Sequence, residues 1–122
     1  MIILITVLVT ILVIWFLFPI IQVCGSSMFP TYHDGEVIVG NKLIRKSKLK
    51  VGDVILYKNK YKTNGKVVIK RIDKKVKGID NKYYFYCLGD NSKESYDSRY
   101  YGYIRSKDII CKVINQRNKG SI

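Results

Sequence analysis

The sequence is poor in the residues that metal sites, disulfide frameworks and histidine-based catalysis require. It has one histidine and three cysteines in 122 residues. Cys24, Cys87 and Cys111 are too few and too scattered for a metal site or a disulfide framework, and their odd number leaves at least one free thiol. His33 lies only six residues beyond Ser27, with a proline between them. This spacing disfavours a histidine-based serine triad, and a Cys/His nucleophile has little support either.

Charge is absent from the start of the chain. No formally charged side chain precedes Asp34, and within residues 1–21 only Thr6 and Thr10 are polar. A 21-residue helix spans roughly 31 Å, which matches the hydrocarbon thickness of a bilayer. The sequence therefore predicts a transmembrane anchor over residues 1–22.

Two other interpretations of this apolar segment are weaker. A cleaved secretory signal has a basic start, a shorter apolar core and a small-residue exit, and the segment fits none of these well. A lipoprotein signal ending at Cys24 is disfavoured by bulky Val23 and by the lack of an opening lysine or arginine. The first basic residue after the segment is Lys42. Because the positive-inside rule counts charges close to the span, we expect a plasma-membrane protein with a cytoplasmic N-terminus and an extracytoplasmic domain.

Beyond the apolar start the chain is strongly basic, with 22 Lys and Arg against 9 Asp and Glu and a net charge of +13. The lysines are spread mainly between Lys42 and Lys77. Such a field suits anionic lipid headgroups, and it would also attract nucleic acid. The chain contains no nucleic-acid-binding motif, so we expect membrane lipids and not nucleic acid as partners.

Short runs of β-branched and aromatic residues alternate with turn residues after the apolar start. No internal repeat is present, and no helical pattern of ten residues interrupts these runs. Closely spaced strands of this kind predict a compact antiparallel β domain at residues 23–115, followed by a frayed tail at 116–122. The polar stretch 89–102 is predicted to be a surface loop. The expected strands lie within residues 35–40, 50–58, 66–72, 82–88 and 109–114.

Lys70 is the lysine best placed to act as a base. A serine hydroxyl is a weak nucleophile until a base removes its proton, and a lysine can do so if burial keeps it neutral. In the run VVIKRI, Lys70 shares a strand face with Val68 and Ile72, whereas Arg71 points to the other face. Periodicity alone also allows the side chain to reach water at a sheet edge.

Four sequence blocks occur in a fixed order after the apolar start: GSSMFPT (25–31), VGDVILYK (51–58), VVIKRI (67–72) and GDNSKESYDSRYYGYI (89–104). Together they resemble bacterial type I signal peptidases, peptidase family S26, in their short Gram-positive-like form. In that family a Gly-x-Ser-Met-x-Pro-Thr box follows a membrane anchor, and the last block reads Gly-Asp-Asn-x-x-x-Ser-x-Asp-Ser-Arg-x-x-Gly.

The resemblance implies a role for each matching residue. Ser27 matches the nucleophile and Lys70 the general base. Ser95 matches the serine that positions the lysine, and Asp97 and Arg99 match an ion pair that braces the loop. Further positions match the oxyanion region and the turn or substrate-binding residues: Gly25, and then Met28, Pro30, Gly89, Asp90 and Asn91.

The function implied is that of a membrane-bound serine endopeptidase. Such enzymes cleave N-terminal signal peptides from exported preproteins after small residues of the Ala-x-Ala type, using a Ser/Lys dyad without metal or cofactor. The large inserted β-subdomain of many relatives is expected to be absent, because the stretch from Lys70 to Gly89 is too short to contain it. Ser92, Glu94 and Cys111 depart from residues frequent in the family, which affects the expected substrate range.

Two other functions stay open on the same fold. One is a specialised pilus or surface-protein processing or assembly factor with narrow or little proteolysis, which would engage secretion or pilus assembly machinery. The other, a self-cleaving repressor, is disfavoured by the apolar start and by the lack of a DNA-binding domain.

Overall fold

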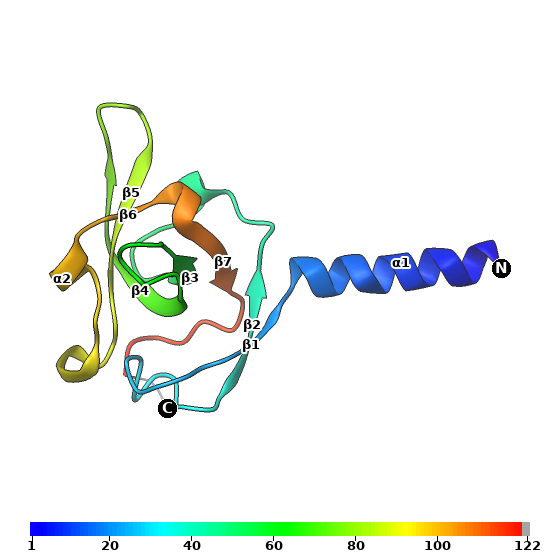
Figure 1. Cartoon of the computed structure of the whole chain (residues 1–122), viewed down its shortest axis with the longest axis horizontal. Coiled ribbons are helices and arrows are strands. Elements are labelled where there is room, and N and C mark those ends of the chain that lie inside the picture. The colour runs from blue at the N-terminus through cyan, green and yellow to red at the C-terminus, as the bar shows by residue number, and fades with distance from the viewer. Residues whose placement is uncertain (121–122) are drawn as a thin grey trace.

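The computed structural model describes residues 1–120 and shows an antiparallel sheet from which one helix projects (Figure 1). The seven strands have the order β1-β2-β7-β3-β4-β5-β6, and every neighbouring pair is antiparallel. The predicted mostly-β, antiparallel architecture is therefore confirmed. The strands are β1 (Ile20–Gln22), β2 (Val37–Asn41), β3 (Val54–Lys58), β4 (Val67–Lys77), β5 (Tyr83–Leu88), β6 (Ile104–Arg105) and β7 (Ile109–Val113).

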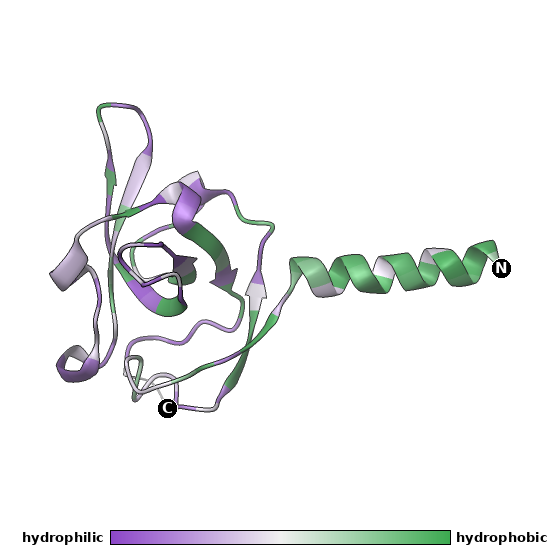
Figure 2. Cartoon of the chain, viewed as in Figure 1, coloured by the Kyte–Doolittle hydropathy of each residue, from purple (hydrophilic) through white to green (hydrophobic). Residues whose placement is uncertain are grey.

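Helix α1 (Ile2–Leu17) is shorter than the sequence suggested. A continuous helix through residue 22 is wrong, because Pro19 disfavours helical backbone in the preceding residue and Phe18 has left the helix with φ −124° and ψ 72°. The next residues instead pair with β2, where Ile20 lies opposite Val39. Figure 2 shows that α1 is apolar on all sides. In the described part of the chain, none of the helices combines the length and apolarity needed to cross a membrane.

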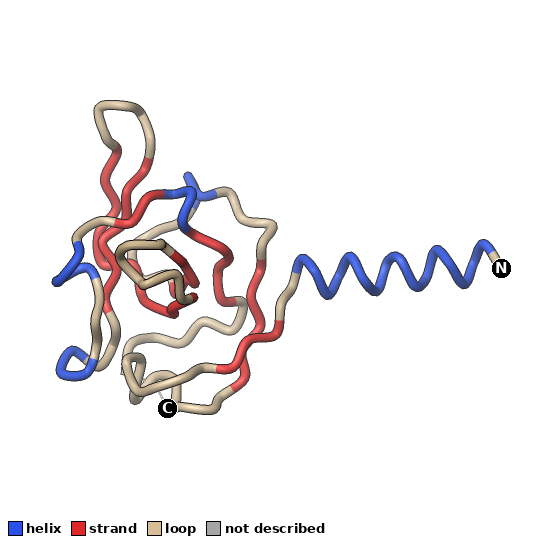
Figure 3. Tube along the Cα trace, viewed as in Figure 1, coloured by secondary structure: helices blue, strands red, loops and turns tan. Residues whose placement is uncertain are grey.

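The five expected strand regions all contain strands, and two short strands were not predicted (Figure 3). β1 was missed because its residues lie inside a continuous apolar run with no alternation, and β6 because it has only two residues. The predicted loop 89–102 also contains two short helices, η2 (Ser92–Glu94) and α2 (Ser98–Tyr101). The segments η1 (Lys46–Lys48) and η3 (Ser106–Asp108) are single 3₁₀ turns.

The core consists of two clusters of buried side chains. Alternation along β4 divides them as a strand requires, since Ile69 belongs to the first cluster and Ile72 to the second. The Phe29–Tyr32 turn and the β1 end pack on the first cluster through Val23, Met28 and Tyr32. The second cluster contains Leu49, Ile55, Tyr57, Ile72, Phe85, Cys87, Ile104 and Ile109.

The segment after β7 is not frayed up to residue 120, contrary to expectation. Arg117 donates from Nη1 to the Glu36 carboxylate and to the Thr31 carbonyl, each at 2.8 Å. Its own carbonyl accepts from Arg71 Nη2 at 2.8 Å, and its guanidinium lies over the Tyr32 ring. The C-terminal segment therefore braces the turn that follows Ser27, while residues 121–122 of the predicted tail lie outside the described part.

Candidate active site

Ser27 lies in a tight loop between β1 and β2. The loop begins with Gly25 at φ +90°, a conformation that favours glycine, and its N–H donates to Asp34 Oδ1 at 2.9 Å. Met28 is fully buried in the core, and its carbonyl accepts from the Tyr32 N–H at 2.9 Å. Pro30 follows a cis peptide bond. Gly25, Met28 and Pro30 thus form the support that fixes the backbone on either side of Ser27.

The loop after β5 holds the Ser27 loop from the other side. Asn91 donates its N–H to the Ser27 carbonyl at 2.8 Å and its side-chain amide to the Ser26 carbonyl at 3.0 Å. The hydroxyl of Ser26 donates to the Glu94 carboxylate. Gly89 lies at the centre of the contact, because a Cβ there would be 2.6 Å from the Ser27 carbonyl oxygen. The two loops therefore position Ser27 together.

Asp90 joins the two loops to the sheet through an ion pair with Arg71 on β4. Arg71 Nε and Nη2 donate to the two carboxylate oxygens of Asp90, each at 2.9 Å. Thr31 donates its hydroxyl proton to Asp90 at 2.6 Å, and the Asp90 N–H contacts the Met28 sulfur at 3.4 Å. A bidentate guanidinium–carboxylate pair fixes both partners in direction. Asp90 thus acts as a structural brace.

Lys70 is buried on β4, opposite Ile55 of β3, with an exposed fraction of 4%. Burial lowers the pKa of its amine below the ordinary value of 10.5, because an ammonium loses solvation there. The Asp97 carboxylate opposes this shift and the Arg99 guanidinium adds to it. The lysine that the sequence selected is thus held where the neutral amine is favoured.

The Asp97 carboxylate binds three other residues of the loop that follows β5. Its Oδ2 accepts from the Ser95 hydroxyl at 2.7 Å and from the Gly89 N–H at 2.9 Å, and Arg99 pairs with it at 2.6 Å. Burial alone would raise its pKa, but the hydrogen bonds from Arg99, Gly89 and Ser95 outweigh burial and hold the pKa at about 2. The Asp97–Arg99 pair expected from the sequence is therefore present, and Ser95 is bonded to this carboxylate.

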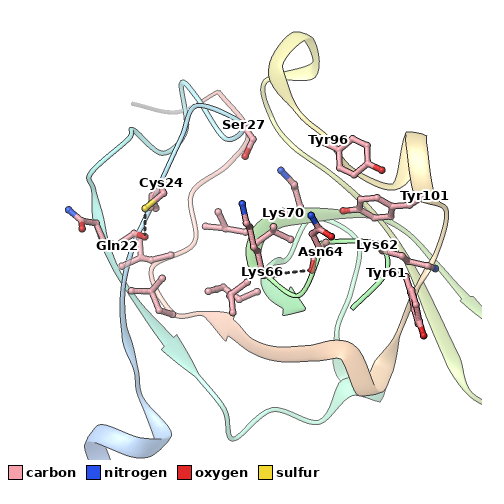
Figure 4. A pocket seen from close by; sticks show the side chains of 18 residues that line it. Gln22, Cys24, Ser27, Tyr61, Lys62, Asn64, Lys66, Lys70, Tyr96 and Tyr101 are labelled. Carbon is pink, nitrogen blue, oxygen red and sulfur yellow. Dashed lines mark hydrogen bonds between the residues drawn. The ribbon is translucent and has the colours of Figure 1, made fainter. Parts of the chain in front are cut away.

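Ser27 and Lys70 both line one cavity of about 730 Å³ (Figure 4). The segment that leads from β1 to Ser27 forms one wall, and the first residues of β4 form another. Apolar side chains also line the space, among them Val23 from the first wall, Ile69 from the second and Leu56 from β3. A cavity with a serine and a buried lysine at one end and apolar walls beyond them can hold an extended peptide.

The cysteines differ in their surroundings. Cys24 is exposed and lines the same cavity as Ser27, whereas Cys87 and Cys111 are buried, and all three are free thiols. Burial raises the pKa of both buried thiols, which keeps them protonated. Within residues 1–120 no group of three or more His, Cys, Asp and Glu side chains is placed to hold a metal ion.

Two supports of the site were not anticipated from the sequence. Ser26 had no assigned chemistry, and its bond to Glu94 links segments 68 residues apart, which no local pattern reveals. The brace from Arg117 to the Thr31 carbonyl spans 86 residues. The only signal for the Ser26–Glu94 bond in the sequence was that Glu94 departs from the family pattern. That departure marked the position of Glu94 but did not indicate Ser26 as its partner.

The chain matches a protein-family model over most of its length. No curated protein matches the chain. The family model described as signal peptidase, peptidase S26, matches residues 1–73 and 73–115, which include the Ser27 loop, Lys70 on β4 and the loop that carries Ser95 and Asp97. On that match, the chain belongs to the signal peptidase family, peptidase S26.

Proposed function

We propose that this protein is a serine endopeptidase that removes N-terminal signal peptides from exported preproteins, with Ser27 as nucleophile and Lys70 as general base. The observation that carries the proposal is the buried Lys70 amine, with its lowered pKa, in the same cavity as the Ser27 hydroxyl. Cleavage after small residues rests on membership of the family.

The proposed first step is attack by Ser27 on the scissile carbonyl carbon. Neutral Lys70 takes the hydroxyl proton while Oγ forms the new C–O bond, and the carbonyl electron pair moves onto oxygen. Among residues 1–120, the Ser27 N–H has no hydrogen-bond partner, so it is free to donate to this oxyanion. The C–N bond then breaks, and protonated Lys70 returns its proton to the leaving amine.

The second step is hydrolysis of the acyl-enzyme. Lys70 takes a proton from water, the resulting hydroxide equivalent attacks the ester carbonyl, and the proton returns to Ser27 Oγ as the acid product leaves. Ser95 supports the lysine in this proposal. Because Ser95 commits its proton to Asp97, its oxygen is left to accept from the Lys70 amine and so to orient it.

Two unpaired backbone edges favour an extended substrate. In the described structure, residues 67–70 pair with β3 on one side only, since the β4–β5 register begins at Arg71. β1 likewise pairs only with β2. Residues from both edges line the cavity, so a peptide can add as a strand through main-chain hydrogen bonds.

We also propose that the enzyme acts at the plasma membrane, with secretory preproteins and membrane lipids as partners. The support is the surface of α1, whose large apolar side chains from Ile2 to Phe16 are exposed and which contains no charged residue. Burial of this surface in lipid would be strongly favourable. Membrane fractionation of the full chain, compared with a chain in which α1 carries lysines, tests this proposal.

Cleavage of a purified precursor with an Ala-x-Ala site tests the enzymatic proposal. We expect Ser27→Ala and Lys70→Ala to abolish cleavage, because each removes one partner of the proton transfer. Ser47→Ala and Lys48→Ala are matched controls, since both residues are exposed on η1 and lie outside the cavity. If the two site variants cleave as fast as the controls, the proposal fails. If the wild-type chain cleaves no precursor at all, the assembly-factor alternative gains support.

A further inference from the structure

The cavity has a cationic side that the proposed chemistry does not use. Figure 4 shows Lys66, the residue just before β4, pointing into the same space as Ser27 and Lys70. Lys62 also lines the cavity, but its amine is tied to the Tyr103 carbonyl. Lys66 is exposed, and among residues 1–120 no ion pair includes it. Its charge is therefore available to a ligand.

No carboxylate balances these charges inside the cavity. Its lining contains three lysines and neither aspartate nor glutamate. Lys70 is buried and the Lys62 amine is bonded to a carbonyl, whereas Lys66 is exposed, so Lys66 is the lysine whose ammonium a ligand can reach. A cleft lined by one sign of charge concentrates groups of the opposite sign. Apolar walls and a free ammonium at the rim together select a mostly apolar peptide that carries one anionic side chain.

The position of Lys66 indicates which part of the substrate it meets. The apolar walls must hold the residues on the acyl side of the scissile bond, because these are the residues that the enzyme is proposed to select. Lys66 immediately precedes β4 and lies four residues before Lys70, so at the strand rise of about 3.3 Å per residue the two are at most roughly 13 Å apart along the chain. A substrate strand beside β4 therefore brings its fourth or fifth residue before the scissile bond within reach of the Lys66 amine.

We infer that Lys66 gives this enzyme a preference for precursors with an acidic side chain at the fourth or fifth residue before the cleaved bond. This inference rests on the proposed function and deepens it by naming a substrate class. The expected preference for an acidic over a neutral residue is about 1.4- to fivefold in kcat/KM, which is equivalent to the roughly 0.2–1 kcal/mol that an exposed ion pair contributes.

Three peptides that differ at one position test the inference. Each has Ala-x-Ala before the scissile bond and Glu, Gln or Lys at the fifth residue before it, with a second set varied at the fourth. For the wild-type chain we expect kcat/KM to fall in the order Glu, Gln, Lys in at least one set. We expect the spread to shrink at high salt, because screening weakens exposed ion pairs.

Charge reversal gives the sharper arm of the experiment. Lys66→Glu should reverse the order of the Glu and Lys peptides, and Lys66→Gln should remove the preference. Lys58→Gln is the matched control, because Lys58 is exposed at the end of β3 and lies outside the cavity. Equal rates on all peptides for the wild type, or an unchanged order for Lys66→Glu, would overturn the inference. Failure to cleave even the Gln peptides would instead refute the proposed function.

Discussion

Addition of one methyl group at Gly89, in Gly89→Ala, is expected to push apart the two loops that carry Ser27 and Ser95. A Cβ at this residue would lie 2.1 Å from Ser95 Oγ and 2.6 Å from the Ser27 carbonyl oxygen, and real Cβ contacts stay above 3.0 Å. Relief of both contacts in Gly89→Ala requires shifts approaching 1 Å in the loops that carry Ser27 and Ser95. A misplacement of about 1 Å costs on the order of 10²-fold in rate, and overpacking costs about 1–3 kcal/mol in stability.

The assay measures kcat/KM on an Ala-x-Ala precursor together with the free energy of unfolding by chemical denaturation. Gly78→Ala is the matched control, because a Cβ there would meet only the side-chain ends of Asp80 and Tyr84 in the β4–β5 hairpin, at 2.7 and 2.8 Å. We expect it to retain nearly full activity. A Gly89→Ala variant whose stability and kcat/KM both stay within twofold of wild type would refute the reasoning from close packing.

Three further predictions concern protonation and thiols. Log(kcat/KM) should rise with pH through a midpoint below 10.5, because only neutral Lys70 accepts the serine proton; a flat pH–rate profile between about pH 5 and 9 would count against a lysine base. Asp97→Asn should lose on the order of 2 kcal/mol of stability at pH 7. The depressed pKa of Asp97 stabilises the fold above the unfolded value of 3.8, and this contribution disappears as pH falls through about 2, so denaturation at pH 7 and pH 2 should show a gap that narrows in acid. A bulky maleimide should label exposed Cys24 in the folded protein and block cleavage, whereas Cys87 and Cys111 should react only after unfolding; peptide mapping of labelled protein would detect the opposite pattern.

Much of the sheet was predictable because its signals are local. Val54–Lys58 follows a Gly-Asp turn, and Ile109–Val113 is a short apolar run, so both were found from β propensity and turn residues. The alternation of residues 68–72 correctly placed Lys70 on an interior face, although it could not say whether the amine stays buried. Only the folded structure, in which Lys70 lies opposite Ile55 of β3 with 4% of its surface exposed, decided that question.

The apolar start shows where composition misleads. Residues 1–21 form one uninterrupted hydrophobic run, and hydropathy alone contains no mark of where a helix must end. Pro19 was the available signal, since the residue before a proline avoids helical backbone. Ile20–Gln22 joined the sheet because β2 offered backbone partners. That choice depends on a strand 17 residues away and not on the local sequence.

The candidate site, like the sheet, was predictable from the sequence only where its signals are local. Ser27 and Lys70 were identified because each lies in a short motif that contains the reactive side chain together with its sequence neighbours. The contacts that hold them in place, Ser26 with Glu94 and Arg117 with the Thr31 carbonyl, join residues that are distant in sequence. Such pairs form only when the sheet brings its loops together, so single-sequence reasoning has no access to them.

The covalent intermediate provides the most direct test of the central claim that Ser27 is the nucleophile. A precursor peptide is mixed with the enzyme, quenched in acid within one turnover, and the chain is mapped by mass spectrometry. We predict an acyl group on Ser27 that is absent from Ser27→Ala and from Lys70→Ala. Cys24 is the rival nucleophile, because it is an exposed thiol in the same cavity. An acyl group on Cys24, or cleavage that persists in Ser27→Ala, would contradict the account.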